Sequence, residues 1–81
     1  MAADVVVFTA PGCTSCERAK MFLKEHGVTF IERNLAGDSR AMDELKALGA
    51  RMLPVVRIGD EMISGFDPAR LRVVLGLAEG G

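Results

Sequence analysis

The two cysteines of this chain, Cys13 and Cys16, stand at the junction between a β-branched apolar run and a helical pattern. The run DVVVF at 4–8 predicts a strand that is covered on both faces, and a Pro-Gly pair ends it. Over about 14–26 the apolar residues recur at helical spacing. A strand covered on both faces and followed by a helix is consistent with an α/β fold, which the order of the remaining elements then has to support.

Beyond residue 27 the sequence predicts three more strands and two more helices, bounded by residues that favour turns or caps. Asp38 or Ser39 begins the first of these helices. Asp67 caps the other, with Pro68 at its first position. The expected strands are 28–35, 54–59 and 61–64, and the expected buried face of the helix that ends at Gly49 consists of Met42, Leu45 and Leu48.

The order of elements is strand, helix, strand, helix, strand, strand, helix. Because helices join the first three strands, we expect those strands to be parallel, with right-handed crossovers. The last two strands are joined by a tight turn at Gly59 and Asp60, so we expect them to be antiparallel. The 81 residues suffice for one domain and not for two, which predicts a single domain over 1–81 with a mixed four-stranded sheet flanked by helices.

Charge and hydropathy exclude several classes of partner. The chain carries 10 Lys and Arg against 11 Asp and Glu, a formal net charge of -1, which offers no electrostatic footprint for nucleic acid or an anionic membrane. No apolar run approaches the length of a membrane span. The N-terminal sequence MAADVVVF carries an acid where a secretory signal is basic, so we expect a cytoplasmic protein whose thiols are kept reduced.

The position of the cysteine pair predicts a division of labour between the two thiols. Cys13 lies at the start of the expected helix, where free N–H groups and the helix dipole stabilise a thiolate, the reactive form. Cys16 lies one turn further on, within disulfide range and pointing inward. We therefore expect Cys13 to attack a disulfide and Cys16 to resolve the mixed disulfide. Nearby, Glu17 opposes the thiolate slightly and Lys20 offsets it.

A structural disulfide, a zinc site and incidental burial are the alternatives for this pair. A disulfide between residues three apart constrains the unfolded chain little, and a reducing cytoplasm does not preserve it. A closed zinc site needs about four ligands, whereas the chain has one CxxC pair and one His, so no metal is expected. The Pro-Gly loop and the helix start argue against burial of Cys13. A CxxC pair beside a strand–helix pattern is typical of a thioredoxin-like redox motif.

Three segments resemble the glutaredoxins and glutaredoxin-like redoxins of the thioredoxin fold. They are GCTSC at the active-site position of that family, MLPVV at its cis-proline motif and SGFDPARL at its Gly-Gly-x-Asp-Asp segment. Their spacing and the order of elements agree over about 5–77. The resemblance implies a thiol–disulfide oxidoreductase in which Cys13 is the nucleophile and Cys16 resolves. It also implies a cis-proline, Pro54, beside the active-site cysteine, with the backbone of Leu53 pairing with an extended peptide or glutathione.

Further substrate contacts are implied at Gly65, Phe66 and Asp67. Asp67 has two interpretations, a glutathione contact and the N-cap of the last helix. For Phe66, a partner contact and a core position both stay open. Arg51, just before the proline loop, is a candidate contact for an anionic partner, with a solvated side chain as its alternative.

The sequence departs from the glutaredoxins at positions that hold glutathione. Their usual Cys-Pro-Tyr-Cys is Cys-Thr-Ser-Cys here, and their Lys three residues before the first cysteine is Ala10. The second Asp of their late motif is Pro68. Gly65 and Phe66 resemble instead the redoxins that serve ribonucleotide reductase and small bacterial glutaredoxin-like proteins, which thioredoxin reductase can recharge.

The sequence therefore predicts a monomeric enzyme that reduces disulfides of proteins or small molecules, with electrons from glutathione or from thioredoxin reductase. No tightly bound cofactor is expected. Two other functions stay open. One is a dimer that holds an iron–sulfur cluster through Cys13 with an added thiol such as glutathione. The other is an adaptor that uses the fold for protein contacts without redox activity.

Overall fold

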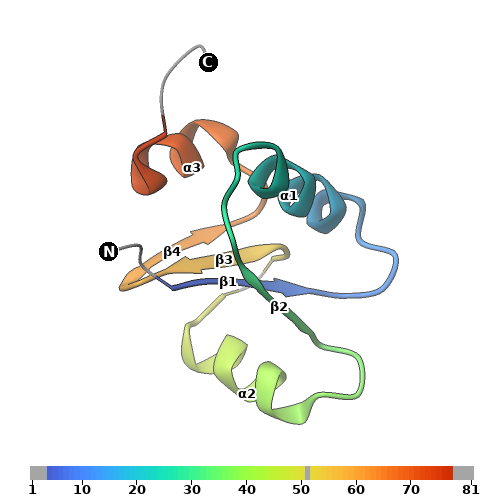
Figure 1. The fold of residues 1–81 in the computed structure, drawn as a ribbon. Helices are drawn as coiled ribbons and strands as arrows, with labels where there is room; N and C mark the ends of the chain where they lie inside the picture. The colour runs from blue at the N-terminus through green and yellow to red at the C-terminus, as the bar shows by residue number, and fades with distance from the viewer. Residues whose placement is uncertain (1–3, 51, 78–81) are drawn as a thin grey trace.

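The computed structural model describes residues 4–50 and 52–77, and within them the predicted order of elements is confirmed (Figure 1). The second strand is shorter than expected, because it covers four residues rather than all of 28–35. None of the helices in these two segments is long and apolar enough to cross a membrane. The elements are β1 (Val5–Thr9), α1 (Thr14–Glu25), β2 (Ile31–Asn34), α2 (Ser39–Ala47), β3 (Val55–Ile58), β4 (Glu61–Ser64) and α3 (Pro68–Leu75).

The strands of the described chain form one sheet in the order β2-β1-β3-β4. Strand β1 is parallel to β2 and antiparallel to β3, and β3 is antiparallel to β4. The mixed four-stranded sheet and the antiparallel pairing of the last two strands are therefore confirmed. The prediction that all of the first three strands are parallel is wrong, because β3 runs against β1.

The direction of β3 depends on the connection that precedes it. Val55, the first residue of β3, lies opposite Phe8 near the carboxyl end of β1, and Asn34 at the end of β2 lies opposite Thr9. Strand β2 thus ends and β3 begins at the same end of the sheet. Residues 48–54, which join α2 to β3, span up to about 23 Å when extended, enough to bring the chain back to that end. A parallel β3 would be expected only if α2 alone carried the chain from the end of β2 to the start of β3.

The antiparallel course of β3 also decides where a functional site can form. Pro54 directly precedes β3, so the proline loop lies at the carboxyl end of β1. The chain leaves β1 at this same end and runs into the loop that carries Cys13. A parallel β3 would place the proline at the opposite end of the sheet, away from the cysteines.

Helices cover both faces of the sheet, as predicted. Successive side chains of β1 point to opposite sides, so this strand contributes to the core on each face. Helices α1 and α3 pack on one face and α2 on the other (Figure 1). All five residues of β1 are buried between them. The core on the face of α1 and α3 consists of Val5, Val7, Phe22, Leu23, Val56, Ile58, Ile63 and Leu71, and the core on the face of α2 consists of Val6, Phe8, Ala41 and Val55.

The start of α2 shows which residue caps it and which face is buried. Asp38 is the N-cap rather than Ser39, because its Oδ1 accepts a hydrogen bond from the N–H of Ala41 at 3.0 Å. Ala41 is fully buried, whereas Met42 is 40% exposed. The prediction that Met42 lies on the buried face is therefore wrong, since the buried stripe of this helix begins one residue earlier.

Candidate active site

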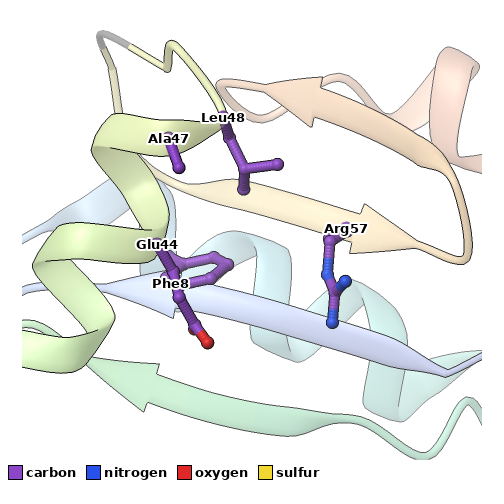
Figure 2. Close-up of a pocket in the computed structure, with 5 residues that line it drawn as sticks. All are labelled: Phe8, Glu44, Ala47, Leu48 and Arg57. Atoms are coloured by element: carbon purple, nitrogen blue, oxygen red, sulfur yellow. The ribbon is translucent and has the colours of Figure 1, made fainter.

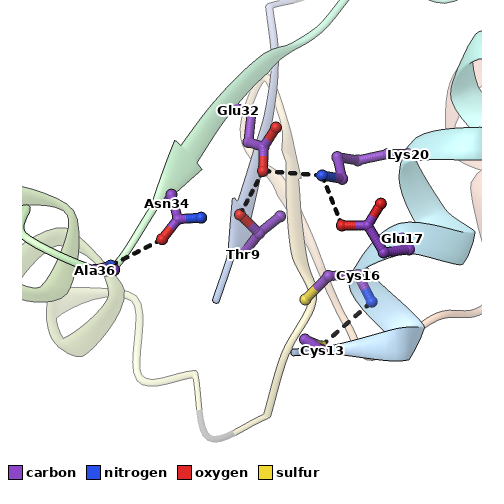
Figure 3. Close-up of polar contacts among 8 residues, drawn as sticks. All are labelled: Thr9, Cys13, Cys16, Glu17, Lys20, Glu32, Asn34 and Ala36. Carbon is purple, nitrogen blue, oxygen red and sulfur yellow. Dashed lines mark hydrogen bonds and ion pairs between the residues drawn. The ribbon is translucent and has the colours of Figure 1, made fainter. Parts of the chain in front are cut away.

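Cys13 is the N-cap of α1, in the position that the sequence predicted for the attacking thiol (Figure 3). Its backbone is extended, with φ −89° and ψ 104°, and its N–H donates to the carbonyl of Ala10 at 3.3 Å. Its Sγ accepts a hydrogen bond from the N–H of Cys16 at 3.3 Å. The half-buried sulfur therefore faces the free N–H groups and the partial positive charge of the first helical turn.

Cys16 lies one turn inside α1 and is fully buried. Figure 3 shows its side chain turned from α1 toward the sheet, beside Cys13. Both cysteines are free thiols in the structure. Burial, and next the hydrogen bond with the Cys13 side chain, raise the pKa of Cys16 to about 11, while the backbone of Ala10 and the charge of Lys20 act in the opposite direction. At neutral pH Cys16 therefore keeps its proton.

A cis peptide bond joins Leu53 to Pro54, as the resemblance implied. Pro54 is fully buried and Leu53 is half-buried. The N–H of Gly65 donates to the carbonyl of Pro54 at 2.7 Å, which ties the start of β3 to the end of β4. Pro54 thus lies at the end of the sheet from which the Cys13 loop also departs.

Gly65 lies against the exposed side chain of Met52, beside the proline loop. Its φ of +78° is left-handed, a conformation that residues with a side chain rarely adopt. A Cβ at this position would lie 3.4 Å from Sδ of Met52, a residue that is 60% exposed. Met52 therefore lies over Gly65 at the edge of the loop, a neighbour of the site that the sequence reasoning did not identify. Its position two residues before Pro54 was the available signal.

The remaining residues that the resemblance implied lie in different surroundings. Phe66 is half-buried and packs edge-to-face on Phe22, with ring centroids 6.0 Å apart, so it contributes to the core under α1 and α3. Asp67 is exposed and caps α3, because its Oδ1 accepts a hydrogen bond from the N–H of Arg70 at 3.1 Å. Arg51 lies outside the described residues.

A polar cluster between α1 and the sheet completes the surroundings of the cysteines (Figure 3). Nζ of Lys20 lies 2.9 Å from a carboxylate oxygen of Glu17 and 3.0 Å from Oε2 of Glu32. The hydroxyl of Thr9 donates to the same Oε2 at 2.8 Å. The helical spacing of Lys20 after Cys16 was visible in the sequence. Glu32 and Thr9 were missed, because only the parallel pairing of β1 with β2 brings them to the helix.

A small pocket lies on the opposite face of the sheet, beside α2 (Figure 2). Its volume of about 220 Å³ is below the roughly 300–1,000 Å³ of typical small-molecule sites. Glu44 at its edge already forms an ion pair with Arg33 at 2.8 Å. The pocket contains neither cysteine, and nothing in it points to a reaction. Its lining residues are Phe8, Glu44, Ala47, Leu48 and Arg57.

The site at the start of α1 combines three features that suit disulfide exchange between two thiols. It has a partly exposed sulfur at a helix N-terminus, a protonated thiol one turn away, and a cis-proline at the same end of the sheet. Across residues 4–50 and 52–77, no three His, Cys, Asp or Glu side chains are grouped in a way that could hold a metal ion.

Comparison with protein families and curated proteins finds one family model and several curated regulators that resemble parts of this chain. A sequence model of the glutaredoxin family matches residues 5–63. The global transcriptional regulator Spx of Bacillus subtilis (strain 168) is 41% identical over 44 residues, which cover 54% of this chain and 34% of that protein. Spx of Staphylococcus aureus (strain Mu50) is 41% identical over 61 residues, 74% of this chain and 44% of that protein. The chain therefore spans less than half the length of these regulators.

Comparison with solved structures agrees with the family match. The glutaredoxin-like NrdH-redoxin from Escherichia coli, described as having a thioredoxin-like activity profile, superposes with a TM-score of 0.81 at 31% identity. That match covers 88% of this chain and 93% of the redoxin. The thioredoxin-like protein BC3987 superposes with a TM-score of 0.84 at 30% identity, covering 89% of this chain and 100% of that one.

Proposed function

The chain belongs to the glutaredoxin family, and from this premise we propose that it is a dithiol thiol–disulfide oxidoreductase that reduces disulfides of proteins or small molecules. The observation that carries the proposal is the hydrogen bond from the N–H of Cys16 to Sγ of Cys13. This bond holds the accessible sulfur at the helix N-terminus, where a thiolate is stabilised and therefore reactive. The buried Cys16 thiol then resolves the mixed disulfide between Cys13 and the substrate.

The first step is attack by the Cys13 thiolate on one sulfur of the substrate disulfide. A bond forms between Sγ of Cys13 and that sulfur, and the substrate S–S bond breaks. The other substrate sulfur leaves as a thiolate and takes a proton from solvent. The product is a mixed disulfide between Cys13 and the substrate.

The second step is attack by Cys16 on the sulfur of Cys13. The Cys13–Cys16 disulfide forms, the bond from Cys13 to the substrate breaks, and the second substrate sulfur leaves as a thiolate that is then protonated. Over both steps the dithiol loses two electrons and two protons to the substrate. A reductant must return them before the next cycle.

Formation of the mixed disulfide itself prepares Cys16 for this attack. In the dithiol protein, the hydrogen bond with Cys13 and the charge of Cys13 both raise the pKa of Cys16. The contribution of the charge disappears once Cys13 is bonded to the substrate, because Cys13 can then carry no negative charge. Burial still raises the pKa of Cys16, while the Ala10 backbone and Lys20 lower it. Cys16 thus becomes easier to ionise when its thiolate is needed.

The proline loop is the proposed docking element for the substrate. Leu53 directly precedes the cis-proline at the end of the sheet that carries Cys13, so an extended peptide that pairs with its backbone would lie across the attacking sulfur. Met52 and Gly65 form the edge of this element. Asp67 caps α3 and Phe66 packs against the core. We propose that either residue contacts the substrate only in addition to this structural role.

For the electron donor we propose that a thioredoxin-reductase-type protein is at least as effective as glutathione. Ala10 offers no cation for a glutathione carboxylate, and Asp67 is already used as a helix cap. The likeness to the NrdH-redoxin, with its thioredoxin-like activity profile, supports the same donor. We further propose that the chain works as a cytoplasmic monomer without a tightly bound cofactor.

The similarity to Spx favours a second candidate, a redox-sensing module in which formation of the Cys13–Cys16 disulfide is the signal. The 41% identity to these transcriptional regulators over 61 residues is the observation behind it. A sensor needs the same pair of thiols, but it does not need rapid repeated turnover. The rate of turnover therefore separates the two functions.

The deciding experiment follows NADPH consumption by the purified protein with a disulfide substrate. One reaction contains thioredoxin reductase, and a second contains glutathione with glutathione reductase. Sustained turnover with either donor supports the oxidoreductase, and stoichiometric oxidation without turnover supports the sensor. Visible absorbance of the freshly purified protein tests the iron–sulfur alternative, because a cluster is coloured and a dithiol is not.

A further inference from the structure

Lys20 is held in place by two carboxylates that come from two different elements. Its ammonium lies 2.9 Å from Glu17 on α1 and 3.0 Å from Glu32 on β2 (Figure 3). The side chain of Lys20 is only 16% exposed, which is unusual for a residue whose long stem normally leaves its charge in water. Its charge therefore has a defined position relative to the helix.

A residue of the sheet, Thr9, holds the carboxylate of Glu32, and the position of the Lys20 ammonium depends on that carboxylate. The hydroxyl of Thr9 donates to Oε2 of Glu32 at 2.8 Å, and Thr9 is 1% exposed at the end of β1. The hydrogen bonds from Thr9 and then from Lys20 lower the pKa of Glu32, while the bonds to Glu17 and Glu32 raise the pKa of Lys20. Glu32 and Lys20 are consequently both charged at neutral pH.

Lys20 lies four residues after Cys16 on α1, so the two side chains lie on the same face of the helix. The groups that face this region are Cys13 at the N-cap, Glu17, Lys20 and Lys24 on α1, Glu32 on β2, and the neutral Thr9 on β1. Lys20 is the cation among them whose charge lowers the pKa of Cys16.

We propose that Lys20 is a positioning residue for the resolving step, in which its fixed ammonium stabilises the thiolate that Cys16 must form to attack the mixed disulfide. The inference rests on the proposed function and deepens it, because it assigns a residue that acts on the sulfur of Cys16 rather than on the sulfur of Cys13. In the mixed disulfide Cys13 cannot carry a negative charge, so that charge no longer opposes the influence of Lys20 on Cys16. The substitution of Lys20 should thus slow resolution and leave the first attack unchanged.

The titration of Cys16 tests the inference without any need for turnover. In the Cys13→Ser protein, Cys16 is the one remaining thiol, and its thiolate absorbance near about 240 nm can be followed to high pH because the chain has no Trp or Tyr. Adding Lys20→Met should move the midpoint upward by about half to one pH unit. Adding Lys20→Arg, which keeps the cation, should restore the parent midpoint. Lys24→Met removes a charge one turn further along the helix and is the matched control.

The rate of resolution is the second measurement, made with both cysteines present. Lys20→Met should slow release of the second substrate thiol about three- to tenfold at pH 8 and let the mixed disulfide accumulate, while formation of that disulfide keeps its rate. Equal midpoints for Lys20→Met and Lys20→Arg, or an equal slowing by Lys24→Met, would overturn the role of Lys20. A native protein that reduces no disulfide would instead overturn the proposed function, and the midpoints would still be measurable.

Discussion

Cys16 donates its backbone N–H to Sγ of Cys13 at 3.3 Å, while its own side chain is fully buried. One residue thus stabilises the attacking sulfur through its backbone and supplies the resolving thiol through its side chain. The two roles are separable, because a substitution at position 16 removes the thiol and keeps the N–H. This separation underlies the first prediction.

Cys13→Ser should reduce disulfide turnover to background, whereas Cys16→Ser should still attack a substrate and stop at the mixed disulfide. The serine at 16 keeps the N–H that supports Cys13 and lacks the sulfur that releases the substrate. Mass spectrometry of each variant after exposure to a disulfide peptide measures the adduct. An adduct on Cys16 of the Cys13→Ser protein, with none on Cys13 of the other variant, would reverse the two roles.

The raised pKa of Cys16 predicts how the stability of the reduced protein depends on pH. The folded pKa of about 11 exceeds the unfolded value of about 9, so the folded state holds this proton more tightly. The resulting stabilisation is fully present below pH 9 and is lost as the pH rises toward 11. The free energy of unfolding, measured with a chemical denaturant, should therefore fall more steeply over this range for the native protein than for Cys16→Ala. Parallel curves would show that Cys16 is not perturbed.

Local signals were enough to predict the elements and the position of the cysteine pair. Asp67 followed by Pro68 marked the start of α3, and the Pro-Gly break marked the junction that carries Cys13. These features depend on residues close together in the sequence, which capping and turn preferences describe. The predicted single domain over 1–81 stays a prediction.

Features that depend on long-range pairing were not predictable in the same way. The direction of β3 depends on how far residues 48–54 carry the chain, and their composition does not encode that distance. The contact between Glu32 and Lys20 depends on the register of β2 against β1, which shifts every side chain if it slips by one residue. The course of β3 matters most, because it is what brings Pro54 to the end of the sheet that carries Cys13.

Gly65→Ala should destabilise the fold by about 1–2 kcal/mol, because a side chain at φ +78° is strained. It should also raise KM for a disulfide peptide, since the new Cβ would meet Sδ of Met52 at 3.4 Å beside the proline loop. Gly37→Ala is the matched control. Gly37 has a similar φ of +72° and nothing within 4 Å of its Cβ position, so this variant should lose stability and keep KM. An equal change of KM in both variants would argue against docking at the proline loop.

Asp67 offers a test of whether its carboxylate does more than cap α3. Asp67→Ala should cost about 0.5–2 kcal/mol of stability, because the N–H of Arg70 loses its acceptor. Asp67→Ser keeps a capping oxygen and removes the charge, so its stability should stay near that of the native protein. If the carboxylate has no part in binding glutathione, Asp67→Ser should also keep the native KM for glutathione. A raised KM in this stable variant would assign the carboxylate to glutathione.

The identity of the donor can be tested at Ala10. A cation at this position would gain a charged hydrogen bond to a glutathione carboxylate, worth about 1.5–3 kcal/mol or roughly ten- to a hundredfold in affinity. Ala10→Lys should therefore raise turnover with glutathione and leave turnover with thioredoxin reductase nearly unchanged. Ala10→Gln adds length without charge, and it controls for simple contact and for any effect on the loop whose Ala10 carbonyl accepts the Cys13 N–H. If the native protein already turns over rapidly with glutathione and Ala10→Lys adds nothing, the preference for a protein donor is wrong.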